Sequence, residues 1–147
     1  MPYLYPKEKK ERNPTPLNRI PPPVLDEGLT GAVQGEQASD LEERYARSLT
    51  KLDKEFSFQY EVYAAGTLPG EAKLVDFVVW DGGVPFPEEV DAAFTHKTAE
   101  QKGYDRIRDA IVDDSLSKDG FQPVRRIDGE RMNTQEGADQ VASELHG

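Results

Sequence analysis

Residues 74–91 read LVDFVVWDGGVPFPEEVD, and this stretch decides the fold. The apolar run at 74–80 predicts a strand that is buried on both faces. Asp76 is its only acid. A turn at 81–83 then leads into a second predicted strand at 84–91. Neighbouring strands are therefore expected to bring Asp76 close to the acids of the second strand, which are Glu88, Glu89 and Asp91.

Carboxylates that a fold gathers within a few ångströms of one another repel, so they are usually neutralised by protons or by a divalent metal. A metal is the more specific expectation here. Pro85 and Pro87 remove two backbone donors from the second strand, so its first half is expected to be an edge, a bulge or a loop.

Upstream of this stretch, Ser39 and Glu42 have the spacing of a capping box, which predicts the start of a helix. The apolar residues that follow share one helical face: Leu41, Tyr45, Leu49, Leu52 and Phe56. From Phe56 the period changes to two, which predicts a strand with Phe58, Tyr60 and Val62 on one side.

Downstream, Thr98 to Leu116 is predicted as a second helix, with an apolar stripe at Tyr104, Ile107 and Ile111. A strand is expected from Phe121 to Ile127, and a closing helix carries Ala138, Val141, Ala142 and Leu145. The predicted order is α-β-β-β-α-β-α, an α/β (α+β) chain with a mixed sheet flanked by helices.

The first 35 residues are rich in proline and show neither helical nor strand periodicity, so residues 1–35 are expected to form an extended arm and 36–147 the folded domain. The arm carries five Lys or Arg and four Asp or Glu, whereas residues 36–147 carry 13 and 24. The net charge of −10 therefore belongs to the domain, and such a domain is repelled by phosphate backbones at long range.

The composition also excludes several classes of protein. The chain has 147 residues and no cysteine, which excludes disulfides, thiolate zinc sites and thiol redox chemistry. No apolar run is long enough for a membrane helix, and the N-terminus lacks the apolar segment of a secretory signal. A cytoplasmic or virion location without membrane contact is expected.

Several motifs occur in a recognisable order: Glu42, Phe58-Gln59, Asp76-Phe77, Glu89-Val90-Asp91, His96, Asp105-Arg106-Ile107-Arg108-Asp109 and Gly120-Phe121 followed by Val124-Arg125-Arg126-Ile127. Over residues 39–127 this pattern resembles the PD-(D/E)XK nuclease superfamily, in its branch related to the very-short-patch mismatch-repair endonuclease. The resemblance implies a restriction-endonuclease-like core. It departs from the family at Asp91, which stands at the usual lysine position, and at Ala92, where glycine is common.

The resemblance further implies a Mg²⁺-dependent endonuclease acting on DNA. Asp76, Glu89 and Asp91 would be the metal ligands, Glu42 a nearby helix acid and His96 a proton-transfer residue. Each has a simpler structural reading, such as a helix cap for Glu42 or an exposed histidine for His96.

Two functions stay open at this point. One is the metal-dependent nuclease. The other is a catalytically inactive structural subunit that keeps the nuclease fold and docks through residues 1–35 onto the protein subunits of a larger assembly, for example a virion.

Overall fold

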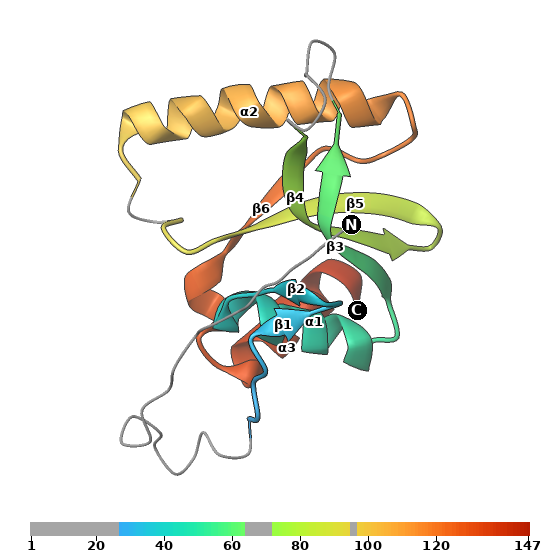
Figure 1. The fold of residues 1–147 in the computed structure, drawn as a ribbon, viewed down its shortest axis with the longest axis vertical. Coiled ribbons are helices and arrows are strands. Elements are labelled where there is room, and N and C mark those ends of the chain that lie inside the picture. The colour runs from blue at the N-terminus through green and yellow to red at the C-terminus, as the bar shows by residue number, and fades with distance from the viewer. Residues whose placement is uncertain (1–26, 64–71, 95–96) are drawn as a thin grey trace.

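The computed structural model describes residues 27–63, 72–94 and 97–147, and it shows an α+β fold with a mixed four-stranded sheet and three α-helices (Figure 1). The elements in chain order are β1 (Ala32–Val33), β2 (Glu36–Gln37), α1 (Asp40–Lys51), β3 (Glu55–Val62), β4 (Lys73–Asp81), β5 (Val84–Asp91), α2 (Ala99–Ser117), β6 (Arg125–Asp128), the 3-10 helix η3 (Gly129–Met132) and α3 (Gln135–His146). From α1 onward, the α-helices and strands follow the predicted order.

The sheet has the order β3-β4-β5-β6, with the first three strands antiparallel and β6 parallel to β5. Gly82 and Gly83 have φ values of 62° and 81°, the left-handed conformation that a two-residue hairpin turn between β4 and β5 requires. Residues 84–88 of β5 pair with β4, whereas residues 88–91 pair with β6. Both prolines therefore lie in the half that has one strand neighbour, which confirms the expected edge.

Two apolar cores lie on opposite faces of the sheet. The larger core joins α1 and α3 to the sheet around Phe77, whose ring centroid lies 5.1 Å from that of Tyr45 and 5.0 Å from that of Phe58. The smaller core joins α2 to the sheet through Val112 and Leu116. Figure 1 shows α2 on one side of the sheet and the α1–α3 pair on the other.

The helix starts follow the predicted chemistry. Ser39 Oγ accepts from the Glu42 amide at 3.2 Å, and Glu42 Oε1 accepts from the Ser39 amide at 2.9 Å, which confirms the capping box. Thr98 and Gln101 form the equivalent box at α2. Among the described residues no helix is long and apolar enough to cross a membrane.

Three local expectations were wrong. Phe58 packs in the α1–α3 core but Tyr60 packs beside the α2 core, because Gln59 adopts a φ of 58° and turns the strand over. The last strand begins at Arg125 rather than at Phe121, since Pro123 has no amide and the Val124 amide donates to Asp113 instead.

The third wrong expectation is the orientation of α2. Its buried side chains are Val112 and Leu116, whereas the predicted stripe is exposed: Tyr104 is 66% exposed, Ile107 62% and Ile111 41%.

The hairpin β1–β2 is a feature that the sequence pattern did not predict. The boundary expected at residues 35 and 36 falls inside it, and Val33 reaches the α1–α3 core. The buried carboxylate of Glu43 accepts hydrogen bonds from the amides of Thr30 and Gly31, which fixes this segment against α1. Residues 1–26 of the expected arm lie outside the described residues.

Candidate functional site

The candidate site lies where β4 and β5 separate. Their ladder ends at the pair Phe77 and Glu88, and beyond it the Asp76 carboxylate accepts the Val90 amide at 2.9 Å. Val75 and Phe77 belong to different cores although they are two residues apart, so the chain rotates at Asp76. This rotation explains how an acid in an apolar strand reaches the backbone of β5.

Asp76 and Glu89 are the two predicted site residues that the fold brings together. Burial, followed by the charges of Glu89 and Glu42, raises the pKa of Asp76 to about 7. Burial also raises the pKa of Glu89, although the charges of Arg108 and Arg126 act in the opposite direction. Glu89 is 8% exposed, and its Oε2 atom is buried without a hydrogen-bond partner among the described residues.

Glu42 has the structural role considered for it, and its role in a nuclease site stays a prediction. It is the acid of the α1 capping box, and its charge contributes to the raised pKa of Asp76. His96 lies outside the described residues, so its proton-transfer role stays a prediction.

Asp91 is occupied by other partners. Its Oδ2 lies 2.5 Å from Lys97 Nζ, and its Oδ1 accepts the Ala93 amide at 3.0 Å. Lys97 also contacts the carboxylate of Asp105. Burial acts to lower the pKa of Lys97, but the hydrogen bonds that its ammonium group donates to Asp105 and Asp91 outweigh burial and raise this pKa. The ammonium group is therefore held in its charged form beside the end of β5.

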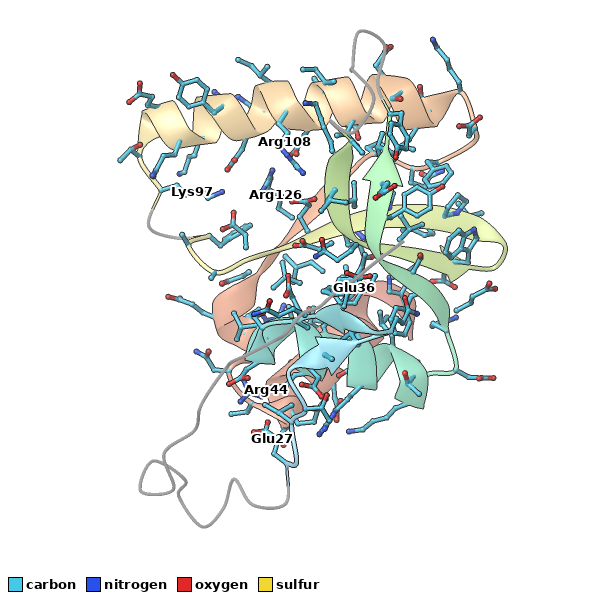
Figure 2. All side chains as sticks on the ribbon, viewed as in Figure 1. Glu27, Glu36, Arg44, Lys97, Arg108 and Arg126 are labelled. Atoms are coloured by element: carbon cyan, nitrogen blue, oxygen red, sulfur yellow. The ribbon has the colours of Figure 1, made fainter. Side chains whose placement is uncertain are left out.

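Arginines from α2 and β6 complete the cluster. Arg108 Nη1 lies 3.3 Å from Glu89 Oε1, while its Nη2 donates to the Leu74 carbonyl at 2.5 Å. Arg126 forms a bidentate pair with Asp109 at 2.9 and 2.8 Å. Figure 2 shows Arg108, Arg126 and Lys97 gathered between α2 and the sheet. Arg125 points to the other face, as the alternation of a strand requires.

A cavity of about 270 Å³ opens beside this cluster. Its lining residues are mostly charged: Asp91, Phe94, Lys97, Lys102, Asp105, Arg106, Asp109 and Arg126. Among the described residues, no group of three or more His, Asp or Glu side chains is placed to hold a metal ion. The pair of Asp76 and Glu89 is thus the strongest candidate for a cation within this part of the chain.

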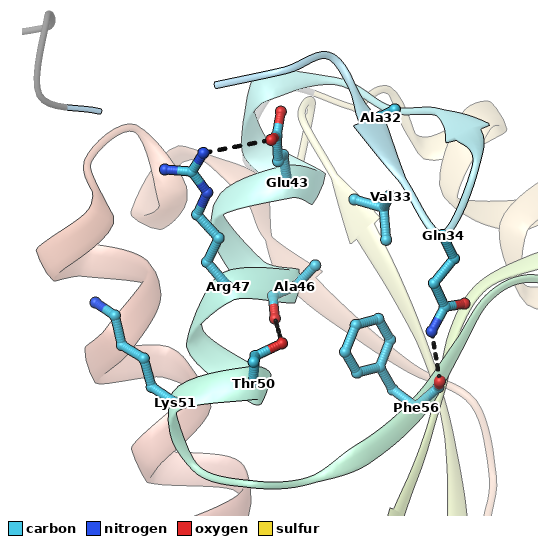
Figure 3. Close-up of a pocket in the computed structure, with 9 residues that line it drawn as sticks. All are labelled: Ala32, Val33, Gln34, Glu43, Ala46, Arg47, Thr50, Lys51 and Phe56. Carbon is cyan, nitrogen blue, oxygen red and sulfur yellow. Dashed lines mark hydrogen bonds and ion pairs between the residues drawn. The ribbon is translucent and has the colours of Figure 1, made fainter. Parts of the chain in front are cut away.

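A second cavity, of about 620 Å³, lies between α1 and the β1–β2 hairpin (Figure 3). Gln34 crosses its edge, donating to the Phe56 carbonyl and accepting the Phe58 amide, both at 2.8 Å. Its cations are engaged: Arg47 lies 3.5 Å from Glu43, and Lys51 lies 2.8 Å from Asp139. Gln34, Arg47 and Lys51 of this cavity are therefore engaged in contacts that hold the fold together.

Sequence reasoning missed the polar network around Glu88 on the opposite face of β5. Glu88 is fully buried and accepts hydrogen bonds from Tyr45, Arg125 and His146. Glu88 and Arg125 are direct partners in the parallel ladder. The sequence placed Glu88 and Arg125 on two predicted strands, but it did not predict the register that pairs them.

Comparisons of this chain with protein-family models, with curated proteins and with solved structures give no match.

Proposed function

We propose that this chain is a metal-dependent phosphodiester hydrolase with a restriction-endonuclease-like core, acting on DNA with Mg²⁺ bound at Asp76 and Glu89. One observation carries the proposal: Asp76 and Glu89 are buried carboxylates on separating strands, the charge of Glu89 helps to raise the pKa of Asp76, and Glu89 Oε2 has no hydrogen-bond partner among the described residues. A divalent cation would satisfy both conditions.

Two carboxylates are sufficient for this metal. Mg²⁺ usually keeps several waters and is bound through one or two carboxylates together with substrate phosphates. When bound, it lowers the pKa of its water and stabilises negative charge on the phosphate. The proposal of this core is supported by the element order from α1 to β6, which is the order over which the motifs of the resemblance were found.

The remaining residues of the cluster have supporting roles in this proposal. Asp91, at the family's lysine position, holds the ammonium group of Lys97 at 2.5 Å, so a positive charge is present near that position. We assign Lys97 to the stabilisation of charge on the attacked phosphate. Arg108, with 34% of its side chain exposed, contacts Glu89 and is assigned to phosphate binding.

The proposal is tested by plasmid nicking with Mg²⁺ or Mn²⁺. Asp76→Asn and Glu89→Gln should abolish nicking, since each removes one charged ligand but keeps the size of the side chain. Asp119→Asn, on the exposed turn after α2, should leave nicking unchanged. Nicking that survives in Asp76→Asn, or a wild-type chain that binds neither metal in calorimetry, would overturn the assignment.

A second function is favoured by the ion pairing of the cluster. Lys97, Arg108 and Arg126 all hold acids, which is the arrangement of a structural core rather than of an open phosphate site. We propose as the alternative a structural subunit of a larger assembly such as a virion. Removing residues 1–26 should then leave the unfolding midpoint unchanged but abolish incorporation into the assembly. Full incorporation of the shortened chain would contradict this alternative.

A further inference from the structure

The described residues expose six large apolar side chains, and all of them lie on α2 or beside it. Tyr104, Ile107 and Ile111 are on the helix itself, at 66%, 62% and 41% exposed. The other three are Leu74, whose carbonyl binds Arg108, Tyr63, whose carbonyl accepts from Ser115, and Phe94, which lines the cavity beside Lys102. Exposed apolar residues that gather in this way mark an interaction surface.

The three helix residues form one stripe. Their spacing of three and four positions places them on one face, opposite the buried Leu116. In Figure 1, α2 lies along one edge of the molecule, and its outer side faces no other labelled element. We call this surface the outer α2 stripe. Helical periodicity therefore produced an apolar face that the described part of the chain leaves exposed.

The ends of the stripe carry opposite charges. Glu100 lies one turn before Tyr104, and Lys118 lies two turns after Ile111, on the same side of the helix. Lys118 keeps helical dihedral angles as the C-cap, so the helical geometry extends to it. Glu100, Asp114 and Lys118 are all exposed.

We infer that the outer α2 stripe is a homodimer interface, in which two copies of α2 pack antiparallel about a two-fold axis. In this register Ile107 meets Ile111 of the second copy, Glu100 meets its Lys118, and Tyr104 meets its Asp114. The two-fold axis repeats each contact. A parallel pairing would instead place Glu100 against Glu100 and Lys118 against Lys118, which repel. The charge pattern thus selects a second copy in one orientation.

The expected dimer is weak. Stable complexes bury about 1,200–2,000 Å², and a contact along one helix of 19 residues is small by comparison. Self-association in the micromolar range or above is therefore expected. The dimer does not depend on the proposed catalytic site, because Tyr104, Ile107 and Ile111 are not among the residues assigned to metal or phosphate binding.

The first test is the oligomeric state of the full chain. Analytical ultracentrifugation over a wide concentration range should show a monomer–dimer equilibrium. Ile107→Asn should shift it to monomer while leaving the circular dichroism spectrum unchanged, and Glu36→Gln, on the exposed β2, should have no effect. A monomer at all concentrations would overturn the inference. The reaction of Ile107→Cys with a thiol reagent would then show whether the chain itself covers the stripe or leaves it open to solvent, and either result leaves the dimer refuted.

The antiparallel orientation of the two α2 helices is tested by disulfide cross-linking. The chain has no cysteine of its own, so every disulfide must form between the introduced residues. A mixture of Ile107→Cys and Ile111→Cys chains should give more disulfide-linked dimer than either variant alone. Glu100→Lys should weaken association, and the double exchange Glu100→Lys with Lys118→Glu should restore it. Preferential linking of Ile107→Cys to itself, or no recovery in the double exchange, would refute the antiparallel register.

Discussion

His146 Nε2 lies 2.7 Å from Glu88 Oε2, and neither side chain is exposed to solvent. The other ring nitrogen, Nδ1, lies 2.8 Å from Asp81 Oδ2. Each nitrogen must carry a proton to donate to its carboxylate, so this arrangement favours the cationic imidazolium. The last residue of α3 is thereby tied to both β4 and β5.

The first prediction concerns the pH dependence of stability. Burial and the charge of Arg125 act to lower the pKa of His146, but the hydrogen bonds to Glu88 and Asp81 and the charge of Glu88 outweigh them and raise this pKa above 6.5. The stabilising contribution is therefore complete below pH 6.5 and is lost as the pH rises through the higher folded value. The free energy of unfolding, measured with urea, should fall over this range.

His146→Gln should flatten this part of the profile, because it removes the titrating group. The chain has one other histidine, so His96→Gln is the matched control and should keep the wild-type profile. Arg125 and Phe86 also contact the ring, at 3.1 Å between nitrogens and 5.7 Å between ring centroids. An unchanged profile in His146→Gln would disprove the assignment.

A second prediction concerns the hydroxyl group of Tyr45. It donates to the fully buried Glu88 Oε1, and its loss in Tyr45→Phe leaves that carboxyl oxygen without this donor. Thermal or urea unfolding should show a loss of about 1–3 kcal/mol. Tyr63→Phe removes a similar hydroxyl from an exposed pair with Glu61 and should change stability by less than about 0.5 kcal/mol. Equal losses of stability in Tyr45→Phe and Tyr63→Phe would show that the burial of Glu88 does not strengthen its hydrogen bond with Tyr45.

Local chemistry made the order of the elements predictable. The capping box at Ser39, the glycine turn at 82–83 and the apolar period of α3 each act within a few residues, and each is found where predicted. The approach of Asp76 to Glu89 was also predictable, because pairing of the two strands of one hairpin places them near each other, although the rotation of the chain at Asp76 was not predictable.

The features that the sequence did not predict depend on contacts between residues that are distant in the chain. The stripe at Tyr104 has ordinary core spacing, but α2 buries Val112 and Leu116 instead, and periodicity alone cannot choose between two apolar faces. The position of His146, 58 residues from Glu88, depends on how α3 docks. The turn at Gln59 had no signal either, since left-handed backbone usually involves glycine or asparagine.

The third prediction concerns Asp76 itself. Its pKa is raised from 3.8 to about 7, so the folded state holds a proton that the unfolded chain releases near pH 4. Stability therefore falls as the pH rises from about 4 to about 7, and the full penalty is present above it. Asp76→Asn removes the charge and can still accept the Val90 amide. At about pH 8 it should be more stable than the wild type by roughly 1–3 kcal/mol, after allowance for partial exposure.

Near pH 4 this difference should shrink toward zero, because the wild-type side chain is then neutral as well. Asp119→Asn, on the exposed turn, should match the wild type at both pH values. Saturating Mg²⁺ should stabilise the wild type but not Asp76→Asn. If Asp76→Asn gains stability and loses nicking, the site shows the trade-off between stability and activity that is typical of a functional site. If Asp76→Asn loses stability at about pH 8, the result contradicts the repulsion between Asp76 and Glu89.

The last prediction compares two glutamines in left-handed backbone, Gln59 with φ of 58° and Gln34 with φ of 51°. Glycine relieves this conformation at either position by about 1 kcal/mol. At Gln34, however, the side chain makes two 2.8 Å hydrogen bonds to the edge of β3, so Gln34→Gly should destabilise the chain. Gln59→Gly should be neutral or stabilising in urea unfolding. A clear loss at Gln59 would mean that its side chain helps to hold the turn of β3 opposite Asp76, because strain relief alone has the opposite sign.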